Sequence, residues 1–232
     1  MSQDSDLNLD LVAFAWFVLL VGGYHIFILW RPPERQSIIS AVQRHRVAWM
    51  RNMALRDNRA IDAILLGNLS HGNAFFASTS VIAIGGSAAA MGAGDQVQAV
   101  FERLPYAAKS SPDLWAAKIL LLSAIFVYAF FKFAWAFRLS HFTAIFVGAT
   151  PLPELANTAA CEEHAERTAA LIGIAADHSN SGLRSFYHAI SALAWFFHPV
   201  LFMAATTWVL AILIRRDFYS RARSILSGQA AW

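Results

Sequence analysis

Apolar residues occur along this chain in long runs, separated by shorter segments in which arginine, glutamate and other polar residues gather. Each run is at least roughly 20 residues long, which is enough for a helix to cross about 30 Å of hydrocarbon. The pattern predicts an all-α, polytopic membrane helix bundle that forms a single domain over residues 1–232. The expected transmembrane helices cover residues 11–30, 60–92, 113–150 and 181–215.

Two segments between the apolar runs have helical periodicity but are too polar to cross a membrane. Residues 35–59 are basic and amphipathic, which predicts either a helix lying on an anionic leaflet or one packed on the protein's own protruding helices. Residues 155–178 are rich in alanine and pair Glu163 with Arg167 at helical spacing, so we expect a helix outside the bilayer. The predicted fold thus has four long transmembrane helices plus interfacial or protruding helices.

Several residues predict where the long helices begin, bend or end. The sequence "SSPD", residues 110–113, predicts the start of the third helix, because serine caps a helix and proline is tolerated in its first turn. Pro199 lies inside the fourth run and predicts a kink. The third run exceeds a simple crossing, so its helix either tilts or projects beyond the membrane. The acidic N-terminus lacks the basic region of a cleavable signal, and the first run is expected to remain as a span.

Composition supports the membrane assignment. Hydrophobic residues make up 57% of the chain and charged residues only 14%, compared with about 25% charged residues in soluble proteins. The net charge is +3, and the arginines flank the apolar runs, which is typical of topology signals rather than of a nucleic-acid surface. The expected partner is therefore the lipid bilayer, with no nucleic acid. A single cysteine, Cys161, excludes an intramolecular disulfide and a multi-cysteine metal site.

The distribution of arginine gives a mixed prediction for topology. The arginine-rich loop 31–59 is expected in the cytoplasm, in a bacterial inner membrane, with the N-terminus outside. Four crossings would then return the C-terminus to the outside, although residues 215–223 are also basic. Either the number of crossings is odd, or one span is re-entrant, or the first loop overrides the tail. The larger cluster comes first, which favours the last alternative.

Four stretches carry a resemblance to a known family: "GYHIFILWR" at residues 23–31, "RVAWMRNM" at 46–53, "GNLSHGNAFFASTSVIAIGG" at 67–86 and "NSGLRSFYHAISALAWFFHP" at 180–199. In order and spacing they resemble the family catalogued as domain of unknown function 599, which comprises membrane proteins of bacteria and plants. The resemblance extends over about residues 10–220. It implies a four-span helical architecture and transfers no catalytic or ligand residues.

The second apolar run contains polar residues, which at bilayer depth require partners or mark a functional site. Three interpretations remain open. The span is central and bonds to neighbouring helices, or it lines a pore or binding site, or His71 ligates a metal or haem. We expect Asn68 and His71 to point away from lipid. The candidate pathway residues of this run are Asn68, His71, Asn73 and Thr79.

The first and fourth runs contain the remaining candidate residues. Arg184 and His188 are one helical turn apart, and together with Tyr187 they form either an anion or lipid-headgroup site or, for Arg184, a snorkelling interfacial position. Tyr24 and His25 lie near the end of the first run, where they form either a hydrogen-bonded structural pair or a proton relay.

Catalytic and cofactor motifs are not evident in the sequence. His25, His71, His188 and His198 offer pairs for a b-type haem, but none has a haem-specific spacing, and we predict no cofactor and no metal site. No phosphate-binding glycine loop, Ser-His-Asp order or H-E-x-x-H motif is present, so a non-enzymatic protein is expected.

The leading functional hypothesis is a homo-oligomeric membrane protein of channel or transporter type, with the second span and the Arg184 region lining a site or pathway. An alternative is an accessory or scaffold subunit of a larger membrane complex, which needs no pore. A third hypothesis is a haem- or quinone-binding redox subunit.

Overall fold

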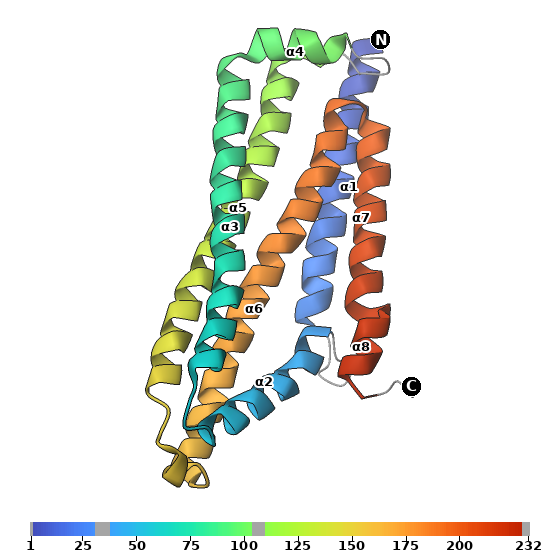
Figure 1. The fold of residues 1–232 in the computed structure, drawn as a ribbon. Coiled ribbons are helices and arrows are strands. Elements are labelled where there is room, and N and C mark those ends of the chain that lie inside the picture. Colours follow the sequence, from blue (N-terminus) through green and yellow to red (C-terminus); the bar gives the residue numbers. More distant parts are fainter. Residues whose placement is uncertain (1, 31–37, 104–109, 229–232) are drawn as a thin grey trace. The chain divides into compact units, whose positions relative to one another are not determined.

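The computed structural model describes residues 2–30, 38–103 and 110–228, and these residues form helices and no strand (Figure 1). The predicted all-α fold is confirmed. The first three residues of the expected 35–59 helix lie outside the described residues. The helices are α1 (Ser2–Leu29), α2 (Ile38–Ala54), α3 (Ala60–Gly92), α4 (Gly94–Glu102), α5 (Pro112–Gly148), η1 (Pro153–Leu155), α6 (Ala159–Leu193), η2 (Ala194–Phe196), α7 (Pro199–Tyr219) and α8 (Arg221–Leu226).

Four helical segments are long and apolar enough to cross a membrane by length and composition. The longest, α5, has 37 residues, and α3 has 33. At 1.5 Å per residue they measure about 55 Å and 50 Å, well beyond the roughly 30 Å of hydrocarbon. The architecture is that of a polytopic membrane helix bundle. The four candidate spans are Asn8–Ile28, Ala60–Gly92, Pro112–Gly148 and Pro199–Leu226.

The expected fourth helix, residues 181–215, is divided in the structure between α6 and α7. Proline has no N–H and is accepted only in the first turn of a helix, so Pro199 starts α7 instead of kinking a longer helix. His198 caps this start, because its Nδ1 accepts a hydrogen bond from the Val200 N–H at 3.1 Å. The separate helix expected over residues 155–178 is the first part of α6.

The start of α5 follows the sequence signal. Ser111 Oγ accepts a hydrogen bond from the Leu114 N–H at 3.2 Å, and Pro112 is the first helical residue. The predicted cap is thus confirmed.

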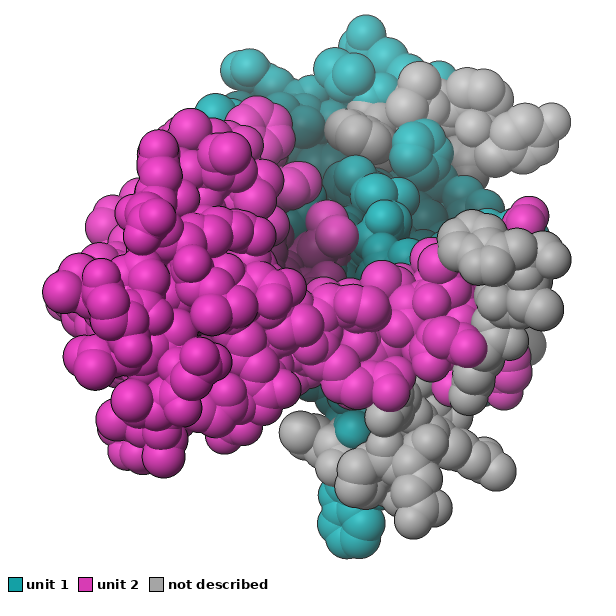
Figure 2. Space-filling view, turned by 60° about the horizontal axis from the view of Figure 1, so that its bottom comes forward, with its two compact units in different colours: residues 1–35, 80–128, 184–216 teal, residues 36–79, 129–183, 217–232 magenta. Residues whose placement is uncertain are grey.

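The chain is organised as two compact units, shown in separate colours in Figure 2. Unit 1 comprises Met1–Arg35, Ser80–Tyr128 and Arg184–Arg216, and unit 2 comprises Gln36–Thr79, Ala129–Leu183 and Asp217–Trp232. Helices α3, α5, α6 and α7 each begin in one unit and end in the other.

The core of unit 1 is aromatic. The fully buried ring of Phe202 on α7 lies 5.2 Å from the ring of Phe17 on α1 and stacks on Trp195 at 5.0 Å. Because these three residues come from α1, η2 and α7, the contact holds distant parts of the chain together. Offset and tilted ring pairs at this separation add to the stabilisation from burial.

In unit 2, α2 packs its apolar face on the protein itself. Met50 and Met53 are fully buried against Leu66 of α3, Val147 of α5 and Ala169 of α6. Of the two interpretations offered by the sequence, packing on the protein's own helices describes this face. The polar edges of α2 form bonds as well, since Arg51 makes ion pairs with Glu162 and Glu166 of α6.

The C-terminal helix α8 contacts α2 within unit 2. The side chain of Arg44 donates to the Ser227 carbonyl at 3.4 Å, and His45 Nε2 donates to the Leu226 carbonyl at 3.1 Å. The two arginine-rich segments of the sequence therefore lie side by side.

Candidate functional site

Three of the residues singled out in the sequence meet in the interior of unit 1. Arg184, only 7% exposed, places its guanidinium 5.7 Å from the ring centroid of Tyr24, within the range of a cation–π contact. His188 lies one turn further along α6, is 5% exposed, and packs edge-on against Phe17 at 6.2 Å. Helices α1 and α6 thus contact each other at a buried arginine. We call Tyr24, His25, Arg184 and His188 the Arg184 cluster.

The hydrogen-bonding capacity of His188 is not filled by the described residues. Within the described part of the chain, neither ring nitrogen of His188 has a hydrogen-bond partner. The hydroxyl of Thr206 on α7 is also buried without one. His188 and Thr206 lie equally far along the chain from the turn at Phe197, which places them at similar depth on two antiparallel helices. Buried polar groups nearly always have a partner, so such groups indicate a bound water, ion or ligand.

The electrostatic surroundings of His188 are basic. The groups that act on its charge are His25 and Arg184, and neither is acidic. His25 itself turns toward α5, with Nε2 3.5 Å from the hydroxyl of Tyr128. Tyr24 and His25 therefore each have a contact with another helix, Tyr24 with Arg184 of α6 and His25 with Tyr128 of α5.

Tyr187 contacts a second arginine, which lies outside the Arg184 cluster. Its ring lies 5.3 Å from the guanidinium of Arg216 on α7, and its hydroxyl accepts a hydrogen bond from Arg216 Nη1 at 3.4 Å. Tyr187 thus contacts Arg216, whereas Tyr24 lies beside Arg184, and a site shared by Arg184, Tyr187 and His188 stays a prediction.

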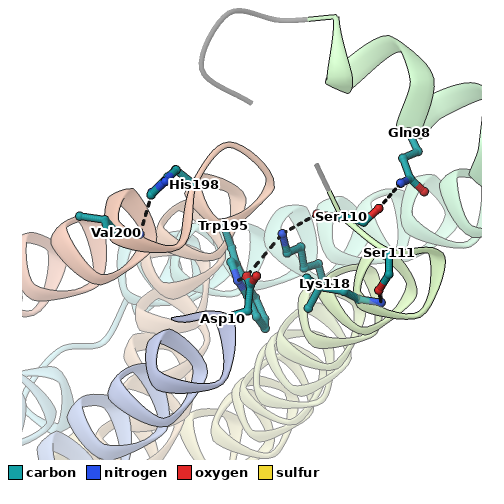
Figure 3. A network of polar contacts seen from close by, with 9 residues as sticks. Asp10, Gln98, Ser110, Ser111, Lys118, Trp195, His198 and Val200 are labelled. Atoms are coloured by element: carbon teal, nitrogen blue, oxygen red, sulfur yellow. Dashed lines mark hydrogen bonds and ion pairs between the residues drawn. The ribbon is translucent and has the colours of Figure 1, made fainter. Parts of the chain in front are cut away.

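A buried ion pair lies near the other end of α1 (Figure 3). Lys118 of α5 is 1% exposed, and its Nζ is 3.7 Å from Asp10 Oδ1 and 2.9 Å from Ser110 Oγ. The same Asp10 oxygen accepts a hydrogen bond from Trp195 Nε1 at 2.6 Å. From Asp10 to Tyr24 the helix rises about 21 Å, so this ion pair and the Arg184 cluster are separated by much of the membrane thickness.

The polar residues of the second run do not share one site. Asn68 and His71 are exposed, Asn73 is buried, and the Thr79 hydroxyl donates to the Phe75 carbonyl of its own helix at 2.9 Å. That Asn68 and His71 point away from lipid stays a prediction, and in the single chain they do not share a face with the buried Asn73. The reason is helical geometry: with 3.6 residues per turn, Asn68 and Asn73 project about 140° apart and cannot face the same neighbour.

Asn68, His71 and Asn73 each line a different cavity of unit 2. Asn68 borders one of about 620 Å³ beside the buried carboxylate of Asp62. His71 borders another of about 320 Å³ together with His141. Asn73 faces a third of about 320 Å³ beneath α2.

Several polar residues of these sites were missed in the sequence. Lys118 lies inside an apolar run and Asp10 at the start of another, and intramembrane charges of this kind are a recognised signal of a site. Thr206 and Arg216 carry no comparable signal, since a threonine in a span and an arginine at its end are ordinary. Among the described residues, no group of three or more His, Cys, Asp or Glu side chains gathers as a metal site.

The long apolar helices and the buried charges between them define a polytopic α-helical membrane protein. The chain belongs to the family described as protein of unknown function, DUF599, which matches residues 12–222. The match covers nearly the whole chain and confirms the resemblance found in the four quoted stretches. No curated protein and no solved structure matches the chain significantly.

Proposed function

We propose that the protein is a non-enzymatic membrane protein of channel or transporter type, with the Arg184 cluster as a binding site for a small anion. The observation that carries the proposal is the buried arginine beside a histidine with two unfilled ring nitrogens. The buried guanidinium of Arg184 places a positive charge at this site. Its planar donors suit a carboxylate or another oxyanion.

The polar surface of α3 supports a homo-oligomer. Asn68 and His71 are exposed on a helix whose other exposed residues include Ile64, Leu65 and Phe75. Such a surface places amide and imidazole groups where a lone chain would present them to lipid, and a second copy would supply partners. We further propose that the protein resides in a bacterial inner membrane with residues 31–59 in the cytoplasm, because that segment is rich in arginine.

The test is anion flux in liposomes that contain the purified full-length protein. Arg184→Gln removes the buried charge, and we expect flux of a permeant small anion to fall at least about tenfold, the effect of losing one charge-assisted hydrogen bond. Arg138→Gln is the matched control, since Arg138 is an exposed arginine of α5 that stacks on Phe142 outside the cluster.

His188→Phe provides a second variant that keeps the charge of Arg184 but removes the two ring nitrogens. Its folding is checked by elution as a single peak from a sizing column. A protein that passes no anion from a broad panel, or variants that match the wild type, would contradict the proposal. Co-purification with another membrane protein at fixed stoichiometry would favour the accessory-subunit alternative.

A further inference from the structure

The cavity beneath α2 in unit 2 has the chemistry of a second binding site, separate from the Arg184 cluster. It has a volume of about 320 Å³ and is bounded by residues of α2, α3, α5 and α6. Its polar lining includes His45 and Arg46 on α2, Asn73 on α3 and Asn180 on α6. The remaining wall is largely apolar, with Leu66 and Ile172 buried at the core of the unit.

The basic side of the cavity is held in place by other parts of unit 2. Arg46 Nη1 donates to Gln43 Oε1 at 3.0 Å, and the Gln43 amide in turn donates to the Ala169 carbonyl of α6 at 3.1 Å. His45 is fixed by its bond to the Leu226 carbonyl. Since a guanidinium carries five N–H donors, Arg46 keeps further donors beyond the one used by Gln43.

The opposite side of the cavity provides a buried amide. Asn73 is 5% exposed, and its Nδ2 donates to the Leu69 carbonyl at 3.4 Å. Asn180 Nδ2 donates to the Ala176 carbonyl at 2.8 Å. An NH₂ group has two hydrogens, so each amide has a second donor after its bond to the helix.

The charge of Arg46 is only partly compensated by the protein. Burial lowers the pKa of Arg46, and the nearby carboxylate of Asp177 opposes this effect without overcoming it. The guanidinium therefore sits in surroundings that still disfavour its charge, and a bound anion would relieve this.

We propose that this cavity binds a phosphate-bearing anion, with Arg46 holding the phosphate and the amides of Asn73 and Asn180 lining the wall opposite. Guanidinium groups match phosphate in planar, paired geometry. A phospholipid headgroup and a free phosphate compound share this chemistry. The apolar part of the wall fits the glycerol and first methylenes of a lipid.

The experiment uses the detergent-solubilised full chain and native mass spectrometry, with dioleoylphosphatidylglycerol and, separately, inorganic phosphate as probes. We expect retained phosphate-bearing adducts on the wild type, and an apparent affinity about tenfold lower or weaker still for Arg46→Gln. Arg44→Gln is the matched control: it removes the same charge from the same helix, but Arg44 is exposed and does not line the cavity. Ala176→Phe fills the cavity and leaves every charge in place.

Binding that is lost in Arg46→Gln and Ala176→Phe but retained in Arg44→Gln supports the site. Preference for the lipid or for inorganic phosphate then identifies the source of the anion. Equal losses in Arg44→Gln and Arg46→Gln would indicate a diffuse basic surface and overturn the proposal, as would the absence of adducts with either probe. The Arg184 cluster shares no residue with this cavity, so the two proposals fail independently.

Discussion

The buried ion pair of unit 1 leads to a sharp prediction about stability. Lys118 and Asp10 are both almost completely buried, and Asp10 is also bonded to Trp195. Replacing one member, as in Lys118→Met, leaves a carboxylate in the interior whose remaining partner among the described residues is the indole N–H of Trp195. Breaking a buried pair in this way costs about 3–5 kcal/mol, because the remaining charge is desolvated and uncompensated.

The double variant Asp10→Asn/Lys118→Met tests whether this cost arises from the charges. Methionine retains much of the lysine volume, and the asparagine oxygen still accepts from Trp195, so no charge is buried. Replacing a whole buried pair by neutral groups is often close to neutral. We therefore expect the double variant to be more stable than Lys118→Met alone, with a coupling of at least about 2 kcal/mol.

The assay is thermal unfolding of the purified protein in detergent, followed by the fraction that elutes as a folded species. For a chain of this length, about 1 kcal/mol shifts the Tm by about 2–4 °C, so Lys118→Met should lower the Tm by roughly 6–20 °C. Lys132→Met is the control, because it removes a partly exposed lysine from the same helix. If Lys118→Met unfolds no earlier than Lys132→Met, or if the two single effects simply add, the ion-pair reasoning is refuted.

Two further predictions concern packing and buried polar groups. Gly182→Ala would place a Cβ 2.7–2.9 Å from the ring of Phe133, which is fully buried and stacked on Phe76, and we expect a loss of about 1–3 kcal/mol in thermal unfolding. Gly173→Ala makes the same change but meets only the flexible end of Gln43, so equal losses in the two variants would contradict the packing argument. Asp62 is fully buried and accepts from both Trp49 and Arg56 at 2.6 Å, and Asp62→Asn should destabilise unit 2 by about 1.5–3 kcal/mol, measured in the same assay. A stability equal to that of the wild type would show that these bonds contribute nothing.

Local features of the fold were predictable because they depend on neighbouring residues. Apolar runs predict long helices, and the cap at Ser111 follows from a serine placed before a proline. The pairing of Lys118 with Asp10 was not predictable, since it depends on how α1 and α5 approach each other. The same holds for Arg184, whose partner Tyr24 was identified in the sequence without any means of connecting the two.

The polar helix α6 shows a different limit of sequence analysis. Its average polarity removes it from the candidate spans, yet Arg184, Ser185, His188 and Ser191 are buried. Hydropathy measures what a helix would present to lipid on all sides, whereas α6 buries its polar residues against other helices. A helix that buries its polar residues is therefore missed by average composition alone.

Contacts within unit 2 lead to a prediction about the path of α6 relative to the membrane. The start of α6 bonds to α2 through Glu162 and Arg51, and the C-terminal α8 bonds to α2 through Leu226 and His45. We therefore expect all three segments to lie on one side of the membrane. If α7 crosses as an apolar span that ends at α8, it begins on the opposite side, and we expect α6, which leads directly into it, to cross as well.

The expected topology has five crossings, with α8 on the same side as α2. This topology places both arginine-rich segments on the same side of the membrane, as the positive-inside rule requires. It thereby removes the conflict that four crossings created. Reporter fusions test this: a fluorescent protein after the last residue and one inserted at Asp57, between α2 and α3, should both fluoresce, and alkaline phosphatase at the same positions should be inactive. Reporters on opposite sides of the membrane would show that α6 does not cross, and would separate α8 from α2.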